Sequence, residues 1–179
     1  NAPAILGRQV EFCDIDATGN IDLNELEKCI KIKPPAAVII VHNFGTIVDV
    51  SKIVNLCKEN NVGIIEDGAP SFYMGEPTTY KPGHSADVIC YSFDFTKFPG
   101  CLGSGGALAT KHQELADRIH EIQAHGTNRA KEIVGIGTKS FLDNTSCSIL
   151  LKEFELFETY KYRDRRRFIL RDKKNRNNV

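Results

Sequence analysis

The chain has 179 residues, enough for one ordinary domain with a sizeable core, and its 23 basic residues balance its 23 acidic ones. Without a net charge it creates no overall field for nucleic acid or acidic lipid, so we expect no nucleic-acid partner. The six cysteines are scattered without a C-x-x-C pair, and no signal peptide or long apolar run is visible. We therefore predict a cytoplasmic, soluble protein that has no metal site and does not enter a membrane.

Strand-like and helix-like segments alternate along the chain. Asp22 followed by Glu25 is a helix-start signature, and Pro34 stops that helix. Residues 36–41 form a continuous apolar run, which is typical of a strand buried on both faces. In chain order we predict a strand at 10–14, a helix from Asp22 to Pro34, a strand at 36–41, a helix from Val50 to near Asn60, strands at 62–65, 86–91 and 105–110, a helix from about Leu115 to His125, and a long helix from about Asp143.

This alternation predicts an α/β fold with a mainly parallel sheet. In such sheets, ligands bind beyond the C-terminal ends of the strands. Asp67 stands at the end of one predicted strand, Ser92 stands at the end of the next, and Lys97 lies in the turn a few residues further on. We therefore expect these three side chains to share one crevice.

A carboxylate, a lysine and a hydroxyl at one sheet edge suit pyridoxal 5'-phosphate. This cofactor needs a carboxylate to keep its ring nitrogen protonated, a lysine for its aldehyde, and hydroxyl or N–H groups for its phosphate. Asp67, Lys97 and Ser92 supply one of each. An opposite charge in contact moves a pKa by about 1–3 units, enough to hold the ring nitrogen charged. Taken singly, each residue also fits an ordinary role in a turn, so the pattern alone leaves the cofactor one interpretation among others.

Longer motifs resemble one protein family. In chain order they are VEFCDID, VIIVHNFG, VGIIEDGAPSF, SFDFTKFPGCLGSGGALAT and QAHGTNRAKEIVGIGTKSFLDNTSCSILL. The second is similar to the segment VHLYG, the third to viEDaAQAhG and the fourth, without a gap, to SFyPgKNLGalGDGGAvvT. The chain resembles the DegT/DnrJ/StrS family of pyridoxal-phosphate-dependent sugar aminotransferases, and the resemblance covers almost its whole length.

The resemblance implies a fold-type-I PLP-transferase-like large domain, which is a three-layer α/β/α arrangement around a mainly parallel sheet. It implies that Lys97 is the internal aldimine lysine and proton-transfer base, Asp67 the partner of the pyridinium, and Ser92 a phosphate ligand. Lys139 stands where the family has an interface Asn, and its ammonium could serve the phosphate as a point charge. The family moves an amino group, usually from glutamate, onto a keto carbon of a nucleotide-linked deoxysugar, and its members are homodimers.

We expect the chain to be the middle of a longer protein. It starts at Asn1 without a methionine, and the family's N-terminal phosphate loop and C-terminal small domain have no counterpart in it. We assign residues 1–142 to the cofactor-binding large domain. Residues 143–179 are assigned to a long helix and a basic tail that lead toward the small domain.

Departures from the family pattern support a second hypothesis. The residues that differ are Pro70, Phe72, Phe98, Ser104, Lys139 and Phe141. Under this hypothesis the chain is an inactive or truncated paralogue that at most binds pyridoxal phosphate or a partner subunit. A plain Rossmann-type nucleotide binder is a third alternative, but no G-x-G-x-x-G follows the first predicted strand.

Overall fold

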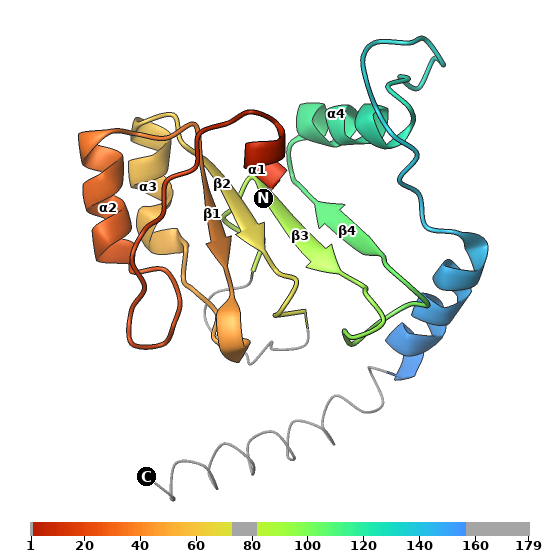
Figure 1. The fold of residues 1–179 in the computed structure, drawn as a ribbon, viewed down its shortest axis with the longest axis horizontal. Helices are drawn as coiled ribbons and strands as arrows, with labels where there is room; N and C mark the ends of the chain where they lie inside the picture. Colours follow the sequence, from red (N-terminus) through yellow and green to blue (C-terminus); the bar gives the residue numbers. More distant parts are fainter. Residues whose placement is uncertain (1, 73–81, 157–179) are drawn as a thin grey trace, which may run out of the picture. The chain divides into compact units, whose positions relative to one another are not determined.

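The computed structural model describes residues 2–72 and 82–156, which belong to two compact units. The first unit comprises Asn1–Cys90 and Leu108–His112, and the second comprises Tyr91–Ala107 and Gln113–Val179. Four strands form one sheet in the order β1-β2-β3-β4 (Figure 1). A single helical turn, α1 (Ala2–Ile5), precedes them.

The first unit is built on three parallel strands, β1 (Ala37–Val41), β2 (Gly63–Asp67) and the first part of β3 (Val88–Ser92). In the β1–β2 pair, Val41 is opposite Asp67, and in the β2–β3 pair, Asp67 is opposite Cys90. The mainly parallel sheet predicted from the sequence is confirmed. Because the strands run in the same direction, the C-terminal ends of β1 and β2 meet at one edge of the sheet, and Asp67 stands there.

Helix α2 (Leu23–Ile32) begins where the sequence predicted. The Asp22 carboxylate caps it, because Oδ1 accepts the amide hydrogen of Asn24 at 2.8 Å and that of Glu25 at 3.4 Å. The helix ends shortly before Pro34, which has no amide hydrogen to continue it. A local signal of three residues was therefore enough to place both ends of this helix.

The core of the first unit lies between one face of the sheet and two helices, α2 and α3 (Ser51–Glu59). Its buried side chains are Leu26, Ile30, Val38, Ile40, Val48, Val50, Ile53, Cys57, Val62, Ile64 and Ala86. On the other face of β1, Ile39 is 45% exposed. The prediction that residues 36–41 are buried on both faces is therefore wrong, because in the described part of this unit both helices pack on the side of Val38 and Ile40.

The strand predicted at residues 10–14 is also wrong. Residues 8–14 have no regular structure, and the nearest pairing is an isolated antiparallel bridge between Ile15 and Ile21. Phe12 is 95% exposed. A strand needs a neighbour to complete its backbone hydrogen bonds, so apolar residues in the sequence could not form one by themselves.

The second unit contains the hairpin that follows β3. Phe93 donates its amide hydrogen to the carbonyl of Gly105 at 2.7 Å, and Phe95 donates to the carbonyl of Gly103 at 3.0 Å. The partner number falls as the donor number rises, so the two segments are antiparallel and lead into β4 (Gly106–Ala109). The predicted turn between two strands, which contains Lys97, is confirmed.

Two helices complete the described part of the second unit. Helix α4 (Gln113–Gln123) corresponds to the helix predicted from about Leu115, and residues 144–156 form the start of the predicted long helix. Asp143 caps this helix by accepting the amide hydrogen of Ser146 at 2.9 Å. The basic tail lies outside the described residues, so the division into 1–142 and 143–179 stays a prediction.

Candidate active site

Asp67 is the last residue of β2, and its side chain is half-buried. Its Oδ1 accepts the amide hydrogen of Ala69 at 2.9 Å, which closes a turn directly after the strand. Its backbone carbonyl accepts the amide hydrogen of His42 at 3.2 Å. Its Oδ2 accepts no hydrogen bond from the residues that the structure describes, so this oxygen is available to a ligand.

The carboxylate of Asp67 affects Cys90, its partner across the β2–β3 pair. Burial raises the pKa of the Cys90 thiol, and the charge of Asp67 raises it further. Cys90 has no positive charge to offer the carboxylate, and Asp67 forms no ion pair within the described part of the first unit. A carboxylate in this state is suited to a cationic N–H group of a ligand.

Ser92 and Lys97 both lie in the hairpin of the second unit. Ser92 ends β3, and its Oγ accepts the amide hydrogen of Asp94 at 3.3 Å. The carboxylate of Asp94 accepts the amide hydrogen of Thr96 at 3.0 Å and its hydroxyl hydrogen at 2.7 Å. The carbonyl of Asp94 accepts the amide hydrogen of Lys97 at 2.8 Å. The structure thus brings two of the predicted residues into one hydrogen-bonded turn.

Asp94 holds this turn in its folded shape. Hydrogen bonds from Thr96 hold the pKa of the Asp94 carboxyl below its usual range, with smaller contributions from the charge of Lys97 and the hydroxyl of Ser104. A carboxyl whose folded pKa is lowered stabilises the fold above its unfolded pKa, and this contribution is lost as the pH falls through the folded value. The turn around Lys97 is therefore held by an ionised Asp94 at neutral pH.

The side chain of Lys97 is exposed, and its ammonium forms no hydrogen bond or ion pair with the described residues. The backbone folds back closely on it, because a Cβ added at Gly100 would lie 2.6 Å from the carbonyl oxygen of Lys97 and 2.8 Å from that of Asp94. Only glycine allows this approach. Lys97 thus has a fixed backbone and an amine that is available for chemistry.

Lys139 lies on another segment of the second unit. It forms an isolated antiparallel bridge with Ala124, and its side chain is exposed. Asp67 belongs to the first unit, whereas Ser92, Lys97 and Lys139 belong to the second. A site shared by all four residues stays a prediction.

One buried pair beside Asp67 was missed from the sequence. His42 follows β1 and Glu66 is next to last in β2; both are 0% exposed, and His42 Nε2 lies 2.9 Å from Glu66 Oε2. The two residues are 24 positions apart, so no local period connects them. The available signal was that each stands at the end of a predicted buried strand, where an ionisable side chain needs a partner.

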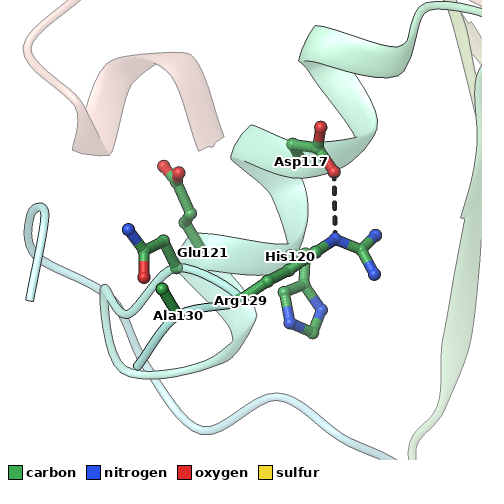
Figure 2. A pocket seen from close by; sticks show the side chains of 6 residues that line it. Asp117, His120, Glu121, Arg129 and Ala130 are labelled. Atoms are coloured by element: carbon green, nitrogen blue, oxygen red, sulfur yellow. Dashed lines mark hydrogen bonds and ion pairs between the residues drawn. The ribbon is translucent and has the colours of Figure 1, made fainter. Parts of the chain in front are cut away.

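A separate cavity of about 250 Å³ lies within the second unit and is lined by Asp117, His120, Glu121, Asn128, Arg129 and Ala130. These side chains come from α4 and the loop after it (Figure 2). Arg129 Nε lies 3.3 Å from Asp117 Oδ1. A hydrogen bond from Gln113 holds the pKa of the Asp117 carboxyl below its usual range, and Arg129 and His120 lower it further. Ligand pockets commonly measure about 300–1,000 Å³. This cavity is smaller, and none of the four predicted site residues lines it.

Three further observations concern membrane spans, metal ligands and cysteines. Within residues 2–72 and 82–156, no helix has the length and apolar character needed to span a membrane. The same ranges contain no group of three or more His, Cys, Asp or Glu side chains that could hold a metal ion. All six cysteines are free thiols.

Comparison with known proteins identifies the family. The model of the DegT/DnrJ/EryC1/StrS aminotransferase family matches residues 1–173. The UDP-2-acetamido-2-deoxy-3-oxo-D-glucuronate aminotransferase of Pseudomonas aeruginosa is 36% identical over 159 residues, which are 87% of this chain and 43% of that protein. The UDP-4-amino-4,6-dideoxy-N-acetyl-beta-L-altrosamine transaminase of Campylobacter jejuni is 30% identical over 164 residues, which are 87% of this chain and 42% of that protein.

Solved structures agree with this result. A DegT DnrJ EryC1 StrS aminotransferase from Brucella abortus has a TM-score of 0.76 at 30% identity, over 90% of this chain and 46% of that one. NtdA from Bacillus subtilis, with bound cofactor PMP, has a TM-score of 0.71 at 27% identity, over 80% of this chain and 32% of that one. These proteins have fold type I, which confirms the predicted fold class for the part of the large domain that the chain covers. The chain spans less than half the length of these relatives. It belongs to the DegT/DnrJ/EryC1/StrS aminotransferase family.

Proposed function

We propose that this chain is the cofactor-binding part of an aminotransferase that uses pyridoxal phosphate to place an amino group on a nucleotide-linked keto sugar. Family membership over residues 1–173 supports the reaction class. The substrate class is supported by two relatives, which are named as an aminotransferase and a transaminase for UDP-linked sugars.

The observation that carries the proposal is the state of Asp67. Its carboxylate ends a parallel strand, and one of its oxygens has no partner among the described residues. Such an oxygen fits the protonated ring nitrogen of the cofactor. Ser92 is the last residue of β3, and we assign its hydroxyl to the cofactor from the family resemblance.

The other groups of the cofactor have counterparts in the second unit. Lys97 offers a primary amine that forms no hydrogen bond or ion pair with the described residues, which suits attachment of the aldehyde. The hydroxyl of Ser92 and the ammonium of Lys139 suit the phosphate, the first as a hydrogen-bond donor and the second as a point charge. When bound, the cofactor supplies an electron sink for charge on the reacting carbon. Lys97 Nζ then carries the proton to and from that carbon, and Asp67 keeps the ring nitrogen protonated.

Titrating the purified chain with pyridoxal phosphate tests this function. We expect a visible absorption band from lysine-bound cofactor, and we expect an amino donor such as glutamate to discharge it. Because the donor converts the aldehyde form of the cofactor to its amine form, the band should return when a nucleotide-linked keto sugar is added. A chain that develops no band does not bind the cofactor as proposed. A band that no amino donor changes would instead support a binding-only paralogue.

Variants of Ser92 and Lys139 should weaken cofactor binding to different extents. A hydrogen bond to a charged group is worth about 1.5–3 kcal/mol, so Ser92→Ala is expected to raise the Kd for pyridoxal phosphate about 10- to 100-fold. Lys139 is exposed, so Lys139→Gln is expected to raise it only about two- to five-fold, with the difference shrinking in high salt. Equilibrium titration at two salt concentrations measures both effects. The exposed Lys111→Gln serves as the control, and an equal loss in this variant would contradict a specific role for Lys139.

We propose further that the amino donor is glutamate and that the protein is a cytoplasmic homodimer. The donor follows from the family resemblance. Free cysteines throughout the chain suit a reducing compartment. Ile133, Ile136 and Phe141, in the segment that also carries Lys139, are 83%, 94% and 53% exposed, as expected of side chains that a second subunit covers. The sedimentation coefficient of the purified chain tests the dimer.

A further inference from the structure

His42 and Glu66 form a fully buried pair next to Asp67. Figure 1 shows β1 and β2 side by side, and the pair joins their C-terminal ends within the first unit. His42 follows the last residue of β1, Glu66 precedes Asp67 in β2, and neither is exposed to solvent. The function proposed above gives this pair no role.

The hydrogen bonds of the pair indicate which ring nitrogen of His42 carries the proton. Val48 donates its amide hydrogen to His42 Nδ1 at 3.2 Å, so this ring nitrogen is an acceptor and the ring proton lies on Nε2. That proton points to Glu66 Oε2 at 2.9 Å. The same oxygen accepts the amide hydrogen of Gly83 at 2.9 Å. Through these hydrogen bonds, Glu66 links the end of β2 to His42, which follows β1, and to Gly83, which precedes β3.

The pair is linked to Asp67 through the backbone. The amide hydrogen of His42 is donated to the carbonyl of Asp67 at 3.2 Å. Successive side chains of a strand point to opposite faces, so Glu66 anchors β2 from its buried face and Asp67 presents its carboxylate on the other. A shift of Glu66 or His42 would therefore move the carboxylate of Asp67.

Stability alone does not explain such a pair. Replacing a buried pair of this kind by apolar side chains of similar size is often neutral or stabilising, because both polar groups lose their hydration on burial. One geometric consequence of the pair is that it holds the backbone at Asp67 in place. We propose that His42 and Glu66 are positioning residues that hold the Asp67 carboxylate in line with the ring nitrogen of the cofactor. This inference rests on the proposed function.

The main test is the pH at which the visible band of bound pyridoxal phosphate changes. A positive ring nitrogen lowers the pKa of the nearby lysine-linked nitrogen, so losing the ring proton moves this midpoint upward. We expect Asp67→Asn to shift the midpoint up by about 1–3 units and the double variant His42→Leu/Glu66→Leu to shift it up by about one unit. Because the pair acts through Asp67, the double variant should add no further shift in the Asp67→Asn background. Glu66→Gln, which keeps an acceptor for His42 and Gly83, should shift the midpoint least.

Ile30→Ala is the matched control, because Ile30 is equally buried in the first unit but lies on α2. It should lower the melting temperature and leave the midpoint unchanged. A midpoint in the double variant equal to that of the wild type would overturn the proposal, as would an additive shift with Asp67→Asn. Either result would show that the pair does not act on the ring nitrogen through Asp67.

A second readout does not depend on the cofactor. Amide hydrogen exchange of Ala69, whose N–H is bonded to Asp67 Oδ1, should be at least about ten-fold faster in the double variant than in Ile30→Ala. If the wild type binds no pyridoxal phosphate, the proposed function fails and this measurement decides the positioning role alone. Equal exchange of Ala69 in the two variants would then overturn it.

Discussion

Replacing Lys97 by alanine is expected to abolish covalent attachment of pyridoxal phosphate and to lower transamination by at least about 10³-fold. Two functions are lost together, because the same amine attaches the cofactor and carries the proton during the reaction. Lys97→Arg should fail equally. The guanidinium keeps the positive charge but stays protonated, so it cannot attach the aldehyde.

Borohydride reduction followed by peptide mass spectrometry measures the attachment directly. In the wild type, the reduced cofactor should be found on the peptide that contains Lys97, and in both variants it should be absent. Lys111→Ala, which removes another exposed lysine, should keep the full adduct. An adduct of undiminished yield on a different lysine in Lys97→Ala would show that the attachment site is elsewhere.

The loss should not come from unfolding. The Lys97 side chain is exposed and forms no hydrogen bond or ion pair with the described residues. The turn is instead held by Asp94, Thr96 and the close approach at Gly100. The free energy of unfolding of Lys97→Ala should therefore lie within about 0.5 kcal/mol of the wild-type value.

Asp94 and Ser104 in this hairpin both differ from the family pattern, and the two side chains interact. The pattern has an acidic residue where this chain has Ser104, and this chain has an acid at Asp94. Ser104 donates a hydrogen bond that helps to lower the pKa of the Asp94 carboxyl. An acid at position 104 would instead repel Asp94 and raise its pKa. The departure at Ser104 is thus compatible with an intact turn around Lys97.

Local signals in the sequence were sufficient for the elements that present the candidate site. The capping pattern at Asp22 placed α2, and the apolar run before Glu66 placed β2 with Asp67 at its end. The glycines after Lys97 indicated a turn and a second strand, which the hydrogen bonds of Phe93 and Phe95 confirm. These features depend on residues close together in the chain, so a single sequence contains them.

Features that depend on distant partners could not be predicted in this way. Residues 10–14 could form a strand only if another strand paired with them. The burial of Ile39 depended on which face of β1 the helices cover. The pairing of His42 with Glu66 joins residues 24 positions apart. In each case the deciding contact is made by another segment, and the residue's own neighbours in the chain give no sign of it.

The second large effect is expected at Asp67. Asp67→Asn removes the negative charge that holds the ring nitrogen protonated, which is worth about 1–3 pKa units, or roughly 1.4–4 kcal/mol. Transamination should therefore fall by about 10- to 10³-fold, while the cofactor still attaches to Lys97. Stopped-flow absorption of the half-reaction with glutamate measures the chemical step without the sugar substrate.

The side-chain amide oxygen that Asp67→Asn introduces can still accept the Ala69 N–H, so the turn after β2 should persist and the protein should stay folded. Asp14→Asn, an exposed site far from β2 in the sequence, controls for the loss of one charge. A cofactor methylated on its ring nitrogen carries a permanent positive charge and needs no carboxylate to keep it. If Asp67 acts by charge, this analogue should restore most of the rate in Asp67→Asn and add nothing in the wild type. Failure of the analogue to restore the rate would assign Asp67 an orienting role instead, because the ring would then be charged but still misplaced.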